Sequence, residues 1–413
     1  MGARFGRKAF QGKAPPFDSL YLQFLTQSNE LLPEQGTCSN TQKAYFVGMT
    51  PEGPSIKELS ELPIIIVDNQ EALDKLTSLI QKIPSIPIDT EANVLDSYPP
   101  QLCLLQLATS DAIYIIDPLT NIRLEAFITE LVQHELIAHC AELDLELLYQ
   151  TFRALPEKIF DTYLAARLLG HAELSLAAQL KKYFNVQLKK KFQKADWRIR
   201  PLSRGMIQYA ANDVRYLGLL AEQFRSKLQE LKRIEWLNEW CEVTKRNVIN
   251  GFNSTEDPWR IKGSSRLAPL SLAILRDLWY WRERTARKLN TPPFQILRNE
   301  QLIQLAIEAT NATAYDRFIP PHLPQTLADE LKNVAAYTKG SDPATWPYPP
   351  ERGRLTPEQR AALERLINRR NQRAKLLGID PTIIASKNTL IKLVVDWEKY
   401  APTLMSWQRA LLQ

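Results

Sequence analysis

The sequence has few residues of the kinds that build disulfide frameworks and zinc sites. Its 413 residues include only four cysteines, which are far apart and form no CxxC pair, and four histidines without an HExxH motif. Separated cysteines of this kind are typical of free thiols in a reducing compartment, so we expect a cytoplasmic protein. Any metal ion that the chain uses would have to be held by carboxylates.

Long apolar runs and targeting segments are also missing. No stretch of the sequence approaches the roughly 18–20 apolar residues that are needed to cross a bilayer, so we expect no membrane association. The basic start of the chain is not followed by an apolar stretch, so we expect no secretory signal, and Gly6 stands where a myristoylation motif needs Ser or Thr. The composition, with 45% hydrophobic and 24% charged residues, is that of an ordinary globular protein.

Charge is distributed unevenly along the chain. Residues 62–225 contain 17 basic and 20 acidic residues, whereas residues 246–413 contain 25 basic and 16 acidic ones. An acidic first half and a basic second half predict a catalytic or metal-binding unit joined to a nucleic-acid-binding unit. Basic helical surfaces that only keep a protein in solution would give the same asymmetry, so the charge pattern alone leaves both interpretations open.

Residues 62–240 have the pattern of an α/β domain. Runs rich in β-branched and apolar side chains predict strands at residues 63–67, 86–92, 102–109, 112–117 and 136–140. Ser110 and Asp111 have the right spacing to join two of these strands as a hairpin. Because three early strands follow one another, we expect a mixed sheet with flanking helices, and residues 143–240 are predicted to be helical with short breaks.

Residues 1–60 show no sustained periodicity and are interpreted as an N-terminal extension. Met1 and Met49 are both possible starts of translation, and the sequence does not choose between them. Order begins near residue 62, where Asp68 is expected to cap the first helix, with Glu71 completing a capping box.

The second half of the chain is predicted to be all-helical. Residues 246–310 and 357–413 each contain a basic helix, a turn with proline and a short apolar helix, so we interpret them as two copies of one helical module. Residues 311–356 carry many prolines and are predicted to be a linker interrupted by one helix.

Two carboxylates stand side by side in the segment IPIDTEA. On a strand, Asp89 and Glu91 point to the same face, and they lie near the C-terminal end of an apolar strand. Adjacent buried anions repel one another, and a divalent cation would relieve this repulsion. A pair of solvated acids at a strand end would have the same sequence.

Two further segments place acids at the start or on one face of a helix. Asp144 falls in the first turn of a helix that follows a strand, where an N-cap role is an alternative. Tyr209 and Asp213 are spaced i and i+4, so they share a helix face. The other residues of that face are apolar, and an acid among them needs a partner such as a metal ion.

These segments together resemble a known family. IDTE at 88–91, HCAELDLELL at 139–148 and YAANDVRYL at 209–217 resemble the three motifs of the DEDDy superfamily of 3′–5′ exonucleases, and more closely those of the ribonuclease D family. Similarity to that family is also found in YPPQLCLLQL at 98–107, FDT at 160–162 and LKKKFQKADWRIRPL at 188–202. The helical segment 268–309 is similar to its HRDC domain, and residues 357–399 resemble a second, weaker copy.

The resemblance implies a ribonuclease H-like exonuclease domain followed by one or two HRDC-like helical bundles. It implies two divalent metal ions, Mg²⁺ or Mn²⁺, held by Asp89, Glu91, Asp144 and Asp213. Asp89 would be shared by both ions, and Tyr209 would hold the attacking water. The product would be a nucleoside 5′-monophosphate released from a 3′ end.

The resemblance also implies a nucleic-acid partner, and tRNA precursors are the RNA that we expect. We predict RNA contacts for the residues Tyr98, Gln101, Lys189, Lys190, Arg198, Arg200 and Arg282. Tyr98 is included because Ala92 stands where the family often has an aromatic residue. We expect a monomer. The alternatives are an exonuclease acting on DNA and a catalytically inactive nucleic-acid-binding protein.

Overall fold

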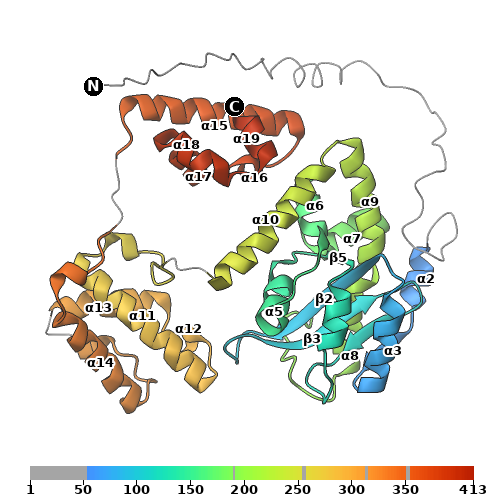
Figure 1. Ribbon diagram of the computed structural model, residues 1–413, viewed down its shortest axis with the longest axis horizontal. Helices are drawn as coiled ribbons and strands as arrows, with labels where there is room; N and C mark the ends of the chain where they lie inside the picture. The colour runs from blue at the N-terminus through green and yellow to red at the C-terminus, as the bar shows by residue number, and fades with distance from the viewer. Residues whose placement is uncertain (1–53, 189–190, 254–256, 312–314, 350–353) are drawn as a thin grey trace, which may run out of the picture. The chain divides into compact units, whose positions relative to one another are not determined.

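The computed structural model describes residues 54–188, 191–253, 257–311, 315–349 and 354–413 (Figure 1). Its exonuclease-like part contains one six-stranded sheet with the order β1-β4-β3-β2-β5-β6. The strands are β1 (Ile64–Val67), β2 (Ser85–Asn93), β3 (Gln101–Ala108), β4 (Ile113–Ile116), β5 (Glu135–Ala138) and β6 (Lys158–Asp161). Strand β3 is antiparallel to β2 and β4, and the other neighbours are parallel, so the predicted mixed sheet is confirmed.

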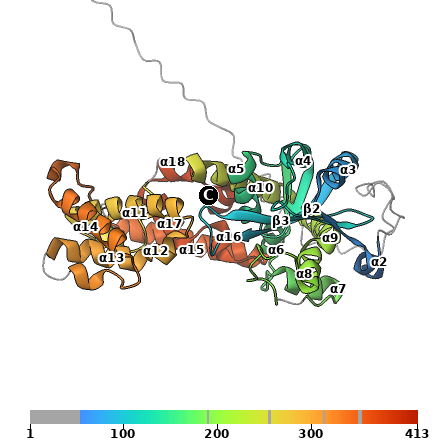
Figure 2. The ribbon, with the colours of Figure 1, turned by 90° about the horizontal axis from the view of Figure 1, so that it is seen from below.

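Helices cover both faces of this sheet. They are α2 (Ile56–Glu61), α3 (Gln70–Ile80), α4 (Glu125–Leu131), α5 (Glu142–Phe152), α6 (Thr162–Leu168), α7 (Leu176–Phe184), α8 (Arg204–Arg215), α9 (Leu217–Glu230) and α10 (Ile234–Asn253). Figure 2 shows α3 and α4 on one face of the sheet and α8 and α9 on the other. Helix α8 packs against β2, β3 and β4, which places its side chains directly over the central strands.

Three details of this domain differ from the prediction. Strand β6 was missed, because its sequence KIFD has only two apolar residues between a lysine and an aspartate and shows neither an apolar run nor alternation. Helix α3 is capped by Asn69, whose side chain accepts from the Ala72 amide, so the capping role of Asp68 was wrong. Helix α2 lies in the expected extension, and its Leu59 is 7% exposed within the core, so the domain begins before residue 62. The rest of the extension, residues 1–53, is outside the described residues.

The remaining described residues form two helical modules and no strand. The first module contains α11 (Pro269–Leu289), α12 (Pro293–Ile296), α13 (Asn299–Glu308) and α14 (Gln325–Lys339). The second contains α15 (Pro357–Leu377), α16 (Pro381–Ile384), α17 (Lys387–Val395), α18 (Trp397–Tyr400) and α19 (Ser406–Leu412). Within the described parts of the chain, no helix is long and apolar enough to cross a membrane.

The two modules repeat one arrangement. Helices α15 and α16 have the same lengths as α11 and α12 and begin 88 residues later. Arg282 donates to the carbonyl oxygen of Leu297, and Arg370, 88 residues on, donates to that of Ala385. The repeated bond supports the interpretation of two copies.

The first module extends beyond its predicted end. Leu331 and Ala335 of α14 belong to the same buried cluster as Leu278 of α11 and Leu302 of α13. The helix that was expected to interrupt a linker is therefore the fourth helix of this module.

Candidate active site

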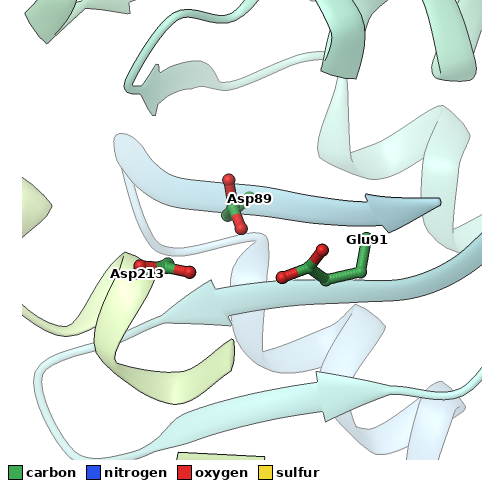
Figure 3. Close-up of side chains that lie close together, drawn as sticks. All are labelled: Asp89, Glu91 and Asp213. Carbon is green, nitrogen blue, oxygen red and sulfur yellow. The ribbon is translucent and has the colours of Figure 1, made fainter. Parts of the chain in front are cut away.

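Three carboxylates from two distant segments meet on one face of the sheet. Asp89 and Glu91 extend from β2, and Asp213 extends toward them from α8 (Figure 3). One carboxylate oxygen from each of the three lies within 4.8 Å of the others. Helix α8 starts at a defined point because the Ser203 side chain accepts from the Met206 amide, and this fixes which turn faces the strand.

A β-bulge lies directly beside this cluster. Glu91 pairs with Leu104 of β3, but the next residue, Ala92, pairs with Leu102, so Cys103 is an extra residue in the ladder. Bulges bend a strand and re-aim its side chains, and they are frequent next to active sites. Here the bulge ends the regular ladder at the residue that supplies the second carboxylate.

The fourth predicted acid, Asp144, is buried beside this group but is held differently. It lies in the first turn of α5, is 5% exposed, and accepts a hydrogen bond from the Thr90 hydroxyl. Thr90 alternates with Asp89 and Glu91 along β2, so it points to the other face of the strand. The structure therefore brings three of the predicted carboxylates into one cluster and places Asp144 next to it, bonded to Thr90.

Asp161 organises the turn that positions Asp144, and its role was not predicted. Its carboxylate accepts from the amides of Cys140 and Ala141, just before α5, and from the amide of Tyr163 at the start of α6. Cys140 has a φ of 67°, in the left-handed region that side chains other than glycine rarely adopt. The FDT segment contains this residue, but only the fold shows that the turn before α5 lies beside it.

Replacing Asp161 with Ala is expected to destabilise the protein by about 3 kcal/mol or more, because it leaves several buried amides unpaired. Asp161→Asn keeps one acceptor oxygen and should reduce the unfolding free energy by less than Asp161→Ala does. Urea unfolding measures both, with the exposed Asp111→Ala as the control. An unfolding free energy equal to that of the control would contradict this role of Asp161.

The carboxylates line a cavity of about 530 Å³ that has an acidic and an apolar side. The apolar side is formed by Tyr163, Leu174, Leu176, Ala177 and Leu188. Among the described residues that line it, no lysine or arginine balances the acids. The cavity is large enough for a nucleotide, and the described residues that line it supply no cation to neutralise its charge.

Burial raises the pKa of all four carboxyl groups. Loss of hydration is the largest cause for each of them, and it raises the pKa of Asp144 and of Asp213 to about 7. The pKa of Glu91 rises to about 9, because the charges of Asp213 and Asp144 add to burial. The pKa of Asp89 lies well above its usual value, since burial and three neighbouring acids act together. Such a cluster becomes fully ionised at neutral pH only if cations compensate it.

Tyr209 lies one helical turn before Asp213 on α8, and both residues line the same cavity. Burial, followed by the charges of Asp213, Glu91 and Asp89, raises the pKa of Tyr209 above that of a free phenol. Its hydroxyl is therefore protonated at neutral pH. It can orient a water molecule through hydrogen bonds, but it is a poor general base.

The cluster fits a hard divalent cation. Its ligand atoms are all carboxylate oxygens, which suit Mg²⁺ and Mn²⁺ rather than softer metals. The absence of a neighbouring lysine or arginine among the described lining residues leaves the negative charge for an ion to neutralise. The same charges that raise the pKa values of the acids would favour binding of a cation.

Two of the residues predicted to contact RNA are bonded within the fold. Arg200 donates to both carboxylate oxygens of Asp117, at 2.5 and 2.6 Å, and to the carbonyl oxygen of Cys103. Arg282 is 5% exposed and donates to Leu297 inside the first helical module. Both guanidinium groups are bonded within the fold, so a contact with RNA would have to displace these bonds, and their role in binding RNA stays a prediction.

The other predicted contacts have varied surroundings. The Tyr98 hydroxyl donates to Glu283, and the Arg287 guanidinium lies 5.3 Å from the centre of its ring, so that ring is already engaged. Arg198 is exposed but paired with Asp196 and with Asp96. Gln101 is exposed at the start of β3. Lys189 and Lys190 lie outside the described residues.

Comparison with known proteins agrees with the geometry. A family model described as 3′-5′ exonuclease matches residues 64–229, and the HRDC domain model matches residues 271–310. The ribonuclease D of Bartonella henselae is 30% identical over 78% of this chain and 82% of that protein. The ribonuclease D of Desulfotalea psychrophila is 29% identical over 84% of this chain and 96% of that protein.

Solved structures show the same fold. The crystal structure of Escherichia coli RNase D, described as an exoribonuclease involved in structured RNA processing, matches with a TM-score of 0.73 and 22% identity. The match covers 85% of this chain and 98% of that one. The catalytic core of RRP6 from Trypanosoma brucei matches over 68% of this chain, with a TM-score of 0.53 and 22% identity.

A mixed sheet with acids from β2 and α8 gathered on one face defines a 3′–5′ exonuclease of the class that uses divalent metal ions. The helices that follow include an HRDC domain. The chain belongs to the ribonuclease D family of exoribonucleases.

Proposed function

We propose that this exoribonuclease trims RNA from its 3′ end by two-metal hydrolysis, with Mg²⁺ or Mn²⁺, and releases nucleoside 5′-monophosphates. The observation that carries the proposal is the buried cluster of Asp89, Glu91 and Asp213, which has no lysine or arginine among its described lining residues. In this proposal Asp144 is the fourth ligand, and Asp89 is shared by both ions.

The ions would supply Lewis acidity, activating water and stabilising the charge on the leaving 3′ oxygen. The chain's own residues would do the rest. The carboxylates would hold the ions that bind the scissile phosphate, and the apolar side of the cavity would exclude water around the terminal nucleotide. Tyr209 would hold the attacking water by a hydrogen bond, since its raised pKa keeps its proton in place.

Precursors of tRNA are the substrates that we propose. The related Escherichia coli RNase D is described as acting in structured RNA processing, and the HRDC domain lies in the more basic half of this chain. Lys191 and Lys194 are exposed residues of the basic stretch and are candidates for contacts with the RNA backbone. The cytoplasmic location and the monomeric state stay predictions.

Tyr209→Phe is expected to lower kcat about 10²-fold with little change in KM, because it removes the hydroxyl that orients water but not the metal ligands. The pH–rate profile should keep its shape, since a protonated phenol does not titrate in the neutral range. Kinetics on 5′-labelled RNA over a range of pH measures the rate, KM and the pH–rate profile of the variant and the wild type. Loss of a limb in the pH profile would instead identify Tyr209 as a general base.

The substrate is tested by matched oligonucleotides. RNA and DNA of the same sequence, with and without a 3′ overhang beside a stable stem, are incubated with the full chain and Mg²⁺ or Mn²⁺. Faster stepwise release of 5′-monophosphates from RNA supports the proposal. Equal or greater rates on DNA favour the DNA exonuclease, and binding without mononucleotide release favours the inactive binding protein.

A further inference from the structure

Gln106 lies directly opposite Asp89 in the sheet. In the antiparallel ladder between β2 and β3, Asp89 pairs with Gln106, and Glu91 pairs with Leu104. Paired residues of an antiparallel ladder project to the same face. Gln106 therefore projects to the face that carries Asp89 and Glu91 and is covered by α8.

The amide of Gln106 is fully buried and unpaired. The residue is 0% exposed, and neither Nε2 nor Oε1 has a hydrogen-bond partner among the described residues. A buried polar atom without a partner costs about 1–3 kcal/mol, so two on one side chain are a substantial cost. An apolar residue of similar size would fill the same space without this free-energy cost. A side chain that stabilised only the fold would not be expected to carry this pair of groups.

The position suits a neutral donor. Cβ atoms of directly paired residues are about 4.5–5.5 Å apart, which brings the end of a glutamine within reach of a neighbouring carboxylate. Carboxylates that bind metal ions are usually hydrogen-bonded by a second group that fixes their orientation. The positive charge of an arginine or lysine at this position would repel the bound cation, whereas an amide adds no charge.

We propose that Gln106 is a positioning residue for Asp89: its Nε2–H donates to the Asp89 carboxylate in the cation-bound enzyme and holds it in the orientation that binds the ion. This inference rests on the proposed metal-dependent function. It gives Gln106, which lies within the family-like segment 98–107, a role toward the site that depends on the pairing of β2 with β3.

Gln106→Met tests this role, because Met has nearly the same volume and no amide. Leu104→Met is the matched control, since Leu104 is a buried neighbour on the same face of β3. For the full chain, calorimetric titration with Mn²⁺ gives Kd, and thermal unfolding in chelator gives Tm. We expect Gln106→Met to weaken Mn²⁺ binding about 10–100-fold. Its Tm in chelator should be unchanged or higher, because two unpaired groups are removed.

The outcomes separate this inference from the proposed function. If the wild type binds no Mn²⁺, the metal-dependent function fails. If the wild type binds Mn²⁺ and Gln106→Met has a Kd within twofold of it, the positioning role is overturned, whatever the change in Tm. Should Gln106→Met fail to fold, Gln106→Asn keeps an amide that is one methylene too short to reach Asp89. It should weaken Mn²⁺ binding in the same direction, and an unchanged Kd would overturn the proposal.

Discussion

Asp89→Asn is expected to reduce kcat/KM on RNA by about 10³-fold or more, because the loss of one metal ligand removes several kcal/mol of transition-state stabilisation. In the presence of chelator the same variant should be more stable than the wild type at pH 8. Asn carries no charge, whereas folding of the wild type without cations must keep a buried carboxyl protonated beside three other acids. Activity and stability would thus change in opposite directions.

Asp111→Asn is the matched control for this experiment. It makes the same chemical change at an exposed acid in the turn between β3 and β4. Mononucleotide release and thermal unfolding in chelator are measured for both variants. An Asp89→Asn enzyme that retains a tenth of wild-type activity, or that unfolds at a lower temperature than wild type in chelator at pH 8, would contradict the assignment of the site.

Removal of divalent cations should abolish activity and make the protein less stable as pH rises from about 5 to 9. The folded pKa of Glu91 is about 9, against 4.5 as a model value, so between these values the folded state binds more protons than the unfolded state. The contribution that these extra protons make to the free energy of unfolding is present at low pH and is lost as pH rises. Asp144 and Asp213, with folded pKa values of about 7, contribute in the lower part of the window.

Thermal unfolding at pH 5.5, 7.0 and 8.5, with chelator or with Mn²⁺, measures this effect. Mn²⁺ should raise Tm by several degrees at pH 8.5 and by less at pH 5.5, where protons compete for the ligands. Glu91→Gln should show a shallower fall of Tm with pH in chelator, because it removes the group with the widest titration window. A Tm in chelator that rises steadily with pH would show that the acids are not buried together.

Most of the secondary structure, and the acids that cluster in the fold, followed from local patterns. The apolar runs predicted β2 and β3, and Ser110 and Asp111 predicted the hairpin between β3 and β4. Spacing alone placed Asp89 with Glu91, and Tyr209 with Asp213, because the periods of a strand and of a helix are fixed by backbone geometry. Strand β6 was missed, since KIFD contains neither an apolar run nor an alternating pattern.

The roles of basic residues are harder to predict from the sequence. A basic stretch of sequence does not distinguish an arginine that contacts RNA from one that holds the fold together. Arg200 binds Asp117, and Arg282 binds the backbone at Leu297, through pairings that join residues far apart in the sequence or within a small module. Charge patterns in the sequence indicate the class of binding partner, but they do not show which side chains can contact that partner.

The sequence by itself determined which residues could carry the chemistry, because motif spacing and strand and helix periods are local properties. Only the tertiary structure decided how they combine: that Asp213 from α8 reaches the acids of β2, that Asp144 is bonded to Thr90, and that Gln106 lies unpaired opposite Asp89. Register across a sheet and the packing of a helix upon it depend on contacts between distant segments. Burial, which sets the pKa values of these acids, arises from the same contacts and is not encoded at any single position.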